Sequence, residues 1–129
     1  MEKQAFYKNL FLAGAIWNWA ATLLFGLGYP FLFPLFNMAE PRYPVFFLLF
    51  LALAFVFGIG YFWVSRDISR NHAIVVLGVI GKLIVFGAFL WAGIAGQIAG
   101  ILVGAGVVDL VFAVLFIEFL ASWSGTGSR

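Results

Sequence analysis

The sequence has no cysteine and few charged residues. Lysine, arginine, aspartate and glutamate make up 9% of the 129 residues, whereas 65% are hydrophobic. A soluble domain needs roughly a quarter of its residues charged to keep its surface hydrated. This composition, with a mean hydropathy of +1.12, therefore indicates an integral membrane protein. The absence of cysteine excludes a disulfide framework, a thiolate metal site and a CxxC redox pair.

Histidine is also scarce, because His72 is the only one. It lies where a polar loop meets an apolar segment, whereas a haem held between helices needs a deep histidine, and often two. The sequence thus disfavours a b-type cytochrome and offers no metal site of its own. It leaves open one His72 ligand to a chlorophyll or metal held by a partner. The net charge of +2 comes from few residues, so it reports on membrane orientation, and we expect no nucleic-acid partner.

Four apolar stretches have about the length that crosses a bilayer as a helix. They cover residues 8–27, 45–64, 74–95 and 98–121. We predict an all-α integral membrane four-helix bundle, forming a single transmembrane domain over residues 1–129. The first stretch resembles a signal peptide, with Lys3 and Lys8 before an apolar run. Because the run is long and more membrane-type sequence follows, we expect it to be retained as an anchor.

The connection between the first two stretches is unusually apolar. It contains Pro30 and Pro34, which oppose a regular helix. We therefore expect the first span to end at Gly28 and Pro30, and residues 29–38 to form a short segment in the membrane interface. Its aromatic side chains would then join the interfacial belt: Tyr29, Phe31, Phe33 and Phe36. The last two spans are joined by the short Gly96-Gln97 turn.

The basic residues near the span ends are unevenly distributed, and this predicts the orientation. Arg42 alone falls on one side. The other side holds Lys3, Lys8, Arg66, Arg70 and Arg129. Because short cytoplasmic loops are rich in lysine and arginine, we expect a multi-pass protein of a bacterial inner membrane with both termini cytoplasmic.

Three polar side chains are predicted at one depth in the membrane. At 1.5 Å per residue, Lys82 lies about 12 Å, Asp109 about 18 Å and Asn18 about 15 Å from the cytoplasmic ends of their spans. A charge at mid-bilayer costs about 2.5 to 3.5 kcal/mol when unpaired. We therefore predict that Lys82 and Asp109 form an ion pair inside the bundle, with Asn18 supplying a further hydrogen bond.

This polar layer has three interpretations. The ion pair can simply fix the register of the helices, as buried polar groups do in some proteins. Alternatively, Lys82 can extend to the cytoplasmic surface and leave Asp109 protonated. In the third interpretation, the layer binds a ligand or quinone, or relays a proton. Trp17 and Trp19 lie at the same depth, where they can either fill space or flank a hydrophobic ligand.

Two further groups of residues are candidates for packing or binding. Small residues on the predicted contact faces would let helices approach closely: Gly78, Gly93, Gly96, Gly100 and Gly104. A polar cluster is predicted near the cytoplasmic side: Arg66, Asp67, Arg70, His72 and Glu118. Glu118 would be solvated or paired with one of the two arginines.

The sequence resembles small four-span bacterial inner-membrane proteins of the broad DoxX-like group. The resemblance covers most of the chain and is carried by these segments: Trp17-Asn18, Gly58-Ile-Gly-Tyr61, Ser65-Arg-Asp67, Gly81-Lys82 and Asp109 to Phe116. It is a likeness of spacing and not of a catalytic signature. The resemblance implies, faintly, a link to quinone-dependent sulfur oxidation or to membrane redox complexes.

No residue pattern names a reaction, so the sequence leans away from an enzyme and offers no catalytic residue. The first hypothesis is an accessory or structural subunit that docks onto a larger respiratory or photosynthetic membrane complex. The second is a redox, proton-relay or ligand-binding protein that holds a quinone or lipid at Asn18, Lys82 and Asp109. The third is a homodimeric transporter, suggested by the Gly100 and Gly104 spacing. The expected partners are the lipid bilayer and either another protein or a second copy. No cofactor is required by the sequence.

Overall fold

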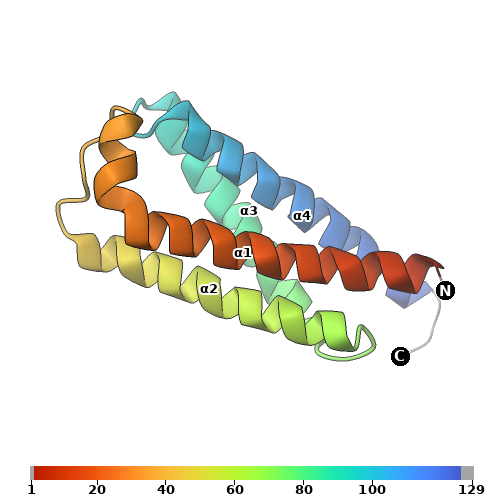
Figure 1. The fold of residues 1–129 in the computed structure, drawn as a ribbon. Helices are drawn as coiled ribbons and strands as arrows, with labels where there is room; N and C mark the ends of the chain where they lie inside the picture. Colours follow the sequence, from red (N-terminus) through yellow and green to blue (C-terminus); the bar gives the residue numbers. More distant parts are fainter. Residues whose placement is uncertain (1, 126–129) are drawn as a thin grey trace.

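The computed structural model describes residues 2–125, with side chains described through Trp123. Four helices account for most of these residues: α1 (Glu2–Leu35), α2 (Pro44–Arg66), α3 (His72–Ile94) and α4 (Gly100–Gly125) (Figure 1). Each is long and apolar enough to cross a membrane. The predicted all-α membrane bundle is confirmed, and each predicted span overlaps one of the four helices.

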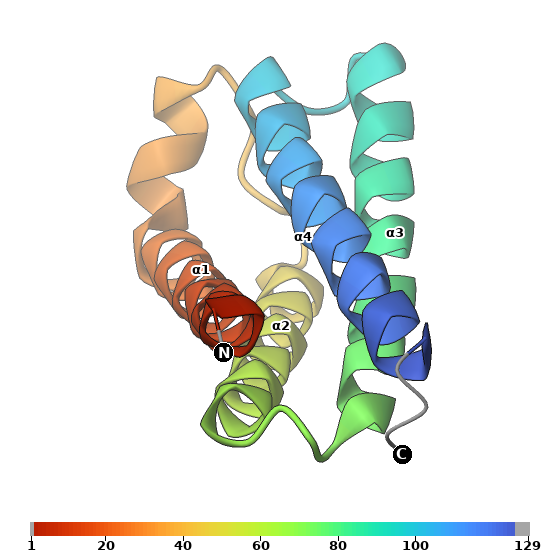
Figure 2. The same cartoon turned by 90° about the vertical axis from the view of Figure 1, so that its right-hand side faces the viewer.

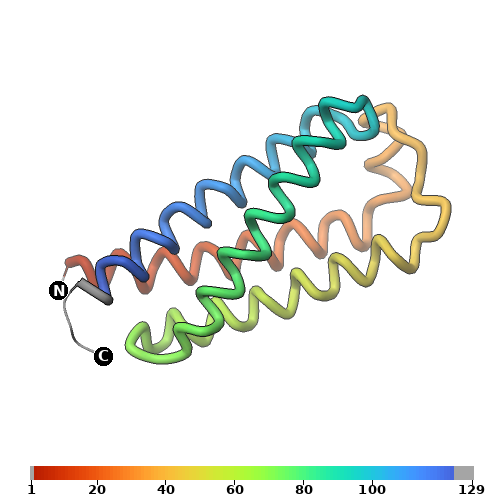
Figure 3. The backbone as a smooth tube through the Cα atoms, turned by 180° about the vertical axis from the view of Figure 1, so that it is seen from behind, coloured from red at the N-terminus to blue at the C-terminus, as the bar shows by residue number. Residues whose placement is uncertain are grey.

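The helices form two antiparallel hairpins, α1 with α2 and α3 with α4 (Figure 2). The start of α1, the end of α4 and the loop of residues 67–71 lie at the end where the hairpins are close together (Figure 3). We call this the narrow end. The hairpins diverge toward the opposite end, which carries the connections of residues 36–43 and 95–99, and we call it the wide end.

The half of the bundle at the narrow end has an aromatic core. Phe11 stacks on Phe116 with ring centroids 4.7 Å apart, and Phe119 meets Phe11 edge to face. Gly14 lets α4 approach α1, because a Cβ there would lie 3.2 Å from the Phe116 ring. This half also contains most of the buried side chains: Tyr7, Leu10, Phe11, Ala15, Tyr61, Val64, Ile68, Val75, Val79, Phe116 and Phe119.

The predicted end of the first span at Gly28 and Pro30 is wrong. Helix α1 continues through both prolines to Leu35 and bends sharply in this region (Figure 1). A proline inside a helix removes one backbone hydrogen bond and kinks the axis, but unsatisfied backbone is so costly in a membrane that the chain stays helical around it. Residues 29–35 are therefore the bent end of α1 and not a separate segment.

The bent end of α1 packs inward. Phe33, predicted in the interfacial belt, is buried at 5% exposure and contacts Tyr29 and Phe47, whereas Phe31 is 73% exposed. The helix ends in a Schellman motif, in which Met38 N–H donates to the Phe33 carbonyl (2.8 Å).

Asn37 supplies the left-handed residue of that motif (φ 59°), and Gly96 (φ 76°) does the same at the end of α3. Ala99 N–H donates to Met38 Sδ at 3.3 Å. The two hairpins are thus joined across the wide end.

The basic residues separate between the two ends as the sequence predicts. Lys3 and Lys8 begin α1 and Arg66 ends α2 at the narrow end, while Arg42 lies in the connection at the wide end. Arg129 lies outside the described residues. The assignment of the narrow end to the cytoplasm stays a prediction.

Candidate functional site

Lys82 and Asp109 meet at the centre of the bundle. Lys82 Nζ lies 2.7 Å from Asp109 Oδ1, and the two side chains are 5% and 17% exposed. The predicted contact is confirmed, and the alternative in which Lys82 reaches the membrane surface is wrong. Since no other ion pair forms among the described side chains, this pair is the main electrostatic link between α3 and α4.

Asn18 connects this ion pair to the first hairpin. Its Oδ1 accepts a hydrogen bond from Lys82 Nζ (3.2 Å), and its Nδ2 donates to the Ala54 carbonyl of α2 (2.7 Å). Thr22, one turn later, donates its hydroxyl hydrogen to the Asn18 carbonyl (2.6 Å). Every polar group of the Asn18 side chain is therefore used, and the polar layer joins all four helices.

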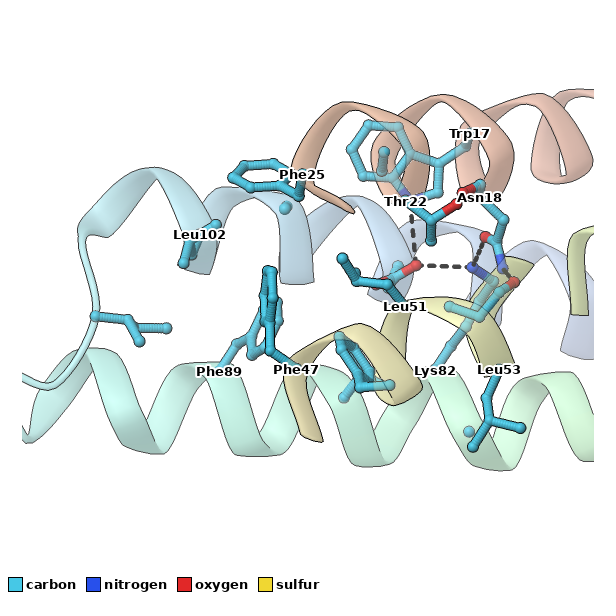
Figure 4. Close-up of a pocket in the computed structure, with 18 of the residues that line it drawn as sticks. Trp17, Asn18, Thr22, Phe25, Phe47, Leu51, Leu53, Lys82, Phe89 and Leu102 are labelled. Carbon is cyan, nitrogen blue, oxygen red and sulfur yellow. Dashed lines mark hydrogen bonds and ion pairs between the residues drawn. The ribbon is translucent and has the colours of Figure 1, made fainter. Parts of the chain in front are cut away.

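Trp17 is a member of this layer that the sequence did not assign to it. Its Nε1–H donates to Asp109 Oδ1 at 3.2 Å, so that one carboxylate oxygen accepts from both Trp17 and Lys82 (Figure 4). The sequence left Trp17 as a packing or ligand-flanking residue. The sequence nevertheless contained a signal for this contact. A buried indole N–H needs a hydrogen-bond acceptor, and Asp109 is predicted to lie at nearly the same membrane depth as Trp17.

Tyr61 is a second residue that sequence reasoning missed. The Lys82 ammonium lies 5.3 Å from the ring centroids of both Tyr61 and Phe112, within range of cation–π attraction. Tyr61 is only 1% exposed, and its hydroxyl has no hydrogen-bond partner among the described residues. The hydroxyl lies against Gly78, where a Cβ would approach it to 2.6 Å.

A cavity of about 530 Å³ lies between the hairpins, from the polar layer to the wide end. Trp17, Asn18, Lys82, Asp109 and Tyr61 border it at the polar layer, and Figure 4 shows Phe25, Phe47 and Phe89 on the side toward the α3–α4 connection. The remaining walls are largely apolar: Phe33, Phe50, Leu51, Leu53, Phe57, Val85 and Leu102.

No family model, curated protein or solved structure matches this chain. The resemblance to DoxX-like proteins therefore stays a prediction.

The predicted packing glycines fall into three groups. Gly78 and Gly93 lie at close contacts, against Tyr61 and Val103 respectively, and Gly96 supplies the turn after α3. Gly100 and Gly104 meet no side chain within 4 Å and are exposed. These last two therefore do not serve packing among the described residues.

The predicted polar cluster near the narrow end does not assemble as one site. His72 Nε2 lies 2.7 Å from the Ile68 carbonyl, and its ring packs edge to face on Phe119 and Trp123. Glu118 is exposed and forms no ion pair with Arg66 or Arg70 in the described part of the chain.

Asp67 and Arg66 make local contacts only. Asp67 Oδ1 accepts hydrogen bonds from the Ser69 hydroxyl (2.5 Å) and backbone N–H (3.0 Å), which lower the pKa of Asp67. The Arg66 guanidinium lies 5.8 Å from the Phe62 ring centroid. We find no cluster of three or more potential metal ligands among residues 2–125.

Proposed function

We propose that this chain is a membrane-embedded binding protein for a small amphipathic molecule. The observation that carries the proposal is an apolar cavity of about 530 Å³ that ends on a buried Lys82–Asp109 pair. Ligand sites are typically concave, mostly apolar and of about 300 to 1,000 Å³, with a few polar groups that fix orientation. Quinones and lipids, the ligands that the sequence left open, both belong to this class.

The two parts of the site have different roles in this proposal. The phenylalanine and leucine walls accept an apolar tail, but they differ little from lipid and so contribute little selectivity. The polar layer is where selectivity arises, because a polar group inside a membrane is costly unless it is paired. Its fixed hydrogen bonds hold Lys82 and Asp109 in place before the ligand enters.

The test is to fill the cavity without disturbing the helices. Gly81 borders the cavity and a Cβ there meets nothing within 4 Å, so Gly81→Leu adds a side chain to open space. Gly87 lies on the same helix, a Cβ there also meets nothing within 4 Å, and it does not border the cavity, so Gly87→Leu is the matched control. Both variants gain similar helix propensity, about 1 kcal/mol or less.

We expect Gly81→Leu to weaken binding of dodecanol and of decylubiquinone by about tenfold or more, which corresponds to about 1.4 kcal/mol. Gly87→Leu should bind both probes as the wild type does. Quenching of tryptophan fluorescence by decylubiquinone reports its binding, because Trp17 borders the cavity, and displacement of the quinone reports binding of dodecanol, which does not quench. Equal affinity of all three proteins would place any bound probe outside the cavity and contradict the proposal.

A second candidate function is docking to a larger membrane complex. The observation that favours it is the exposed face of α4 at Gly100 and Gly104, where an added Cβ would meet no other side chain within 4 Å and a neighbouring helix could approach closely. A respiratory or photosynthetic partner should then co-purify in mild detergent, and Gly104→Leu should abolish this. A monomer without partners in several detergents would count against it. A homodimeric transporter would use the same face of α4 for dimer contact. Its test is a measurement of substrate flux across the membrane of reconstituted vesicles.

A further inference from the structure

We infer that the ligand held in the cavity is an uncharged amphipathic molecule whose head group is a hydroxyl or a carbonyl. This inference rests on the proposed function and concerns the chemistry of the head group. It is drawn from two independent features of the polar layer: its charge balance and its unused hydrogen-bonding groups.

The charge balance excludes an ionic head. Among the described residues, Lys82 and Asp109 are the only charged ones that border the cavity, and they already neutralise each other at 2.7 Å. A carboxylate or phosphate head would leave one net negative charge in an apolar space, and an ammonium head would leave one net positive charge. Either arrangement costs several kcal/mol in a membrane interior, whereas an uncharged head avoids this cost.

The unused hydrogen-bonding groups match a hydroxyl. Both bonds to Asp109 reach Oδ1, so Oδ2 is free to accept. The Lys82 ammonium has three N–H groups and two acceptors, Asp109 and Asn18. The Tyr61 hydroxyl also has no partner in the described part of the chain.

These free groups border open space. In the described part of the chain, Trp19 Nε1 is the only fully enclosed side-chain nitrogen or oxygen without a partner. The Tyr61 hydroxyl and Asp109 Oδ2 are therefore not sealed by protein, and both residues border the cavity. A hydroxyl head can donate to Asp109 Oδ2 while it accepts from Tyr61 or Lys82, and a carbonyl head can accept from the latter two.

The decisive experiment compares three probes with the same tail. Dodecanol, dodecanoate and dodecylamine are offered to the wild-type protein in lipid nanodiscs at about pH 8, where the carboxylic acid and the amine are both charged. Native mass spectrometry measures binding, and displacement of decylubiquinone, which quenches tryptophan fluorescence, provides a second readout. We expect dodecanol to bind about tenfold or more tightly than either ionic probe. A buried charge that lacks a partner costs more than the roughly 1.4 kcal/mol that corresponds to tenfold in affinity.

Changing the charge of the layer should change the preferred probe. Asp109→Asn leaves Lys82 without its counter-ion, so dodecanoate should become the tightest probe and gain about tenfold or more. Lys82→Met leaves Asp109 unpaired and should favour dodecylamine in the same way. If these variants do not fold, the wild-type order and the tyrosine variants described next decide the question.

The Tyr61 hydroxyl is tested without altering any charge. Tyr61→Phe keeps the ring and should weaken dodecanol binding about two- to tenfold, the worth of one hydrogen bond. Tyr7→Phe is the control, because the Tyr7 hydroxyl pairs with Ser122 (3.2 Å) at the narrow end and does not border the cavity. It should leave dodecanol binding unchanged.

The outcomes separate this inference from the proposed function. Equal binding of the three probes, with loss of all three in Gly81→Leu, would support a lipid cavity and overturn the inference about the head group. Binding of none of the probes would overturn both. Tightest wild-type binding of dodecanoate or dodecylamine would also overturn the inference, because it would require a net charge that the layer lacks.

Discussion

The two halves of the bundle differ in what lies between their hairpins. At the narrow end, Phe11, Phe116 and Phe119 interlock with their ring centroids 4.7 to 5.0 Å apart. Toward the wide end, phenylalanines such as Phe47 and Phe89 line a cavity of about 530 Å³. Both halves are rich in the same residue type, so hydrophobicity does not explain the difference. The divergence of the hairpins does.

The polar layer lies at the boundary between these halves. Gly78 and Gly81, one turn apart on α3, illustrate the change: a Cβ on Gly78 would meet Tyr61 at 2.6 Å, whereas one on Gly81 would meet nothing within 4 Å. The packed half thus holds the charged groups in fixed positions, while the open half leaves them accessible from one side. A rigid base next to an open volume is what a ligand site requires.

The largest expected effect comes from breaking the ion pair at this boundary. Lys82→Met or Asp109→Asn alone leaves one buried charge uncompensated and should lower the free energy of unfolding by about 3 to 5 kcal/mol. The double variant removes both charges and should cost less than either single change. Unfolding in mixed micelles with increasing sodium dodecyl sulfate measures all four proteins.

The matched control is Glu118→Gln, which removes an exposed acid on the same helix as Asp109 and should leave the stability nearly unchanged. Single and double variants whose losses simply add would mean that the two charges do not depend on each other. The boundary would then be set by packing alone.

A smaller effect should separate the packed half from the open half by one helical turn. Gly78→Ala forces a methyl group against Tyr61, which is only 1% exposed and cannot move freely, so it should destabilise the protein by about 1 to 3 kcal/mol. Gly81→Ala enters open space and should stabilise α3 by about 0.5 to 1 kcal/mol through helix propensity. The same unfolding titration compares them.

Two results would break the comparison between the halves. If Gly81→Ala destabilises as much as Gly78→Ala, the cavity closes around this position in the membrane. If neither change alters the free energy of unfolding, Tyr61 is mobile and the packed half is not rigid where it meets the polar layer. Tyr61→Phe with Gly78→Ala should keep most of the strain, because the ring carbon Cε1 still lies 2.7 Å from the added Cβ.

The polar layer was predictable because a bilayer leaves a charged side chain few options. Lys82, Asp109 and Asn18 stand out in apolar spans, and their depths follow from the rise per residue of a helix. The chain also had to form antiparallel neighbours, since its connections are short. The contact between Lys82 and Asp109 therefore followed from the sequence.

The cavity and the bend of α1 were not predictable in the same way. A cavity depends on the angle between two hairpins, and the aromatic residues that line it have the composition of an ordinary core. Pro30 predicts a helix end because proline often ends helices in water, where loops are hydrated. In a membrane, backbone groups without hydrogen bonds are so costly that the helix continues past the proline. Tyr61 was missed because nothing in its own segment marks a tyrosine that faces a charge on another helix.

The smallest expected effect concerns the loop that closes the packed half. The Ser69 hydroxyl and backbone N–H hold the pKa of Asp67 below its ordinary value, with Arg70 contributing. Because the folded-state pKa is lowered, the carboxylate supports this loop fully above the ordinary pKa, and the support is lost as the pH falls through the folded-state value. Ser69→Ala removes the stronger donor, so the pKa of Asp67 should rise partway toward normal, while Ser69→Thr should preserve it. A carboxyl-detected NMR titration measures this. An unchanged pKa in Ser69→Ala would assign the shift to the remaining backbone N–H of residue 69 and to the charges of Arg70 and Lys8. Added salt would then separate these two causes, because it screens only the charge attraction.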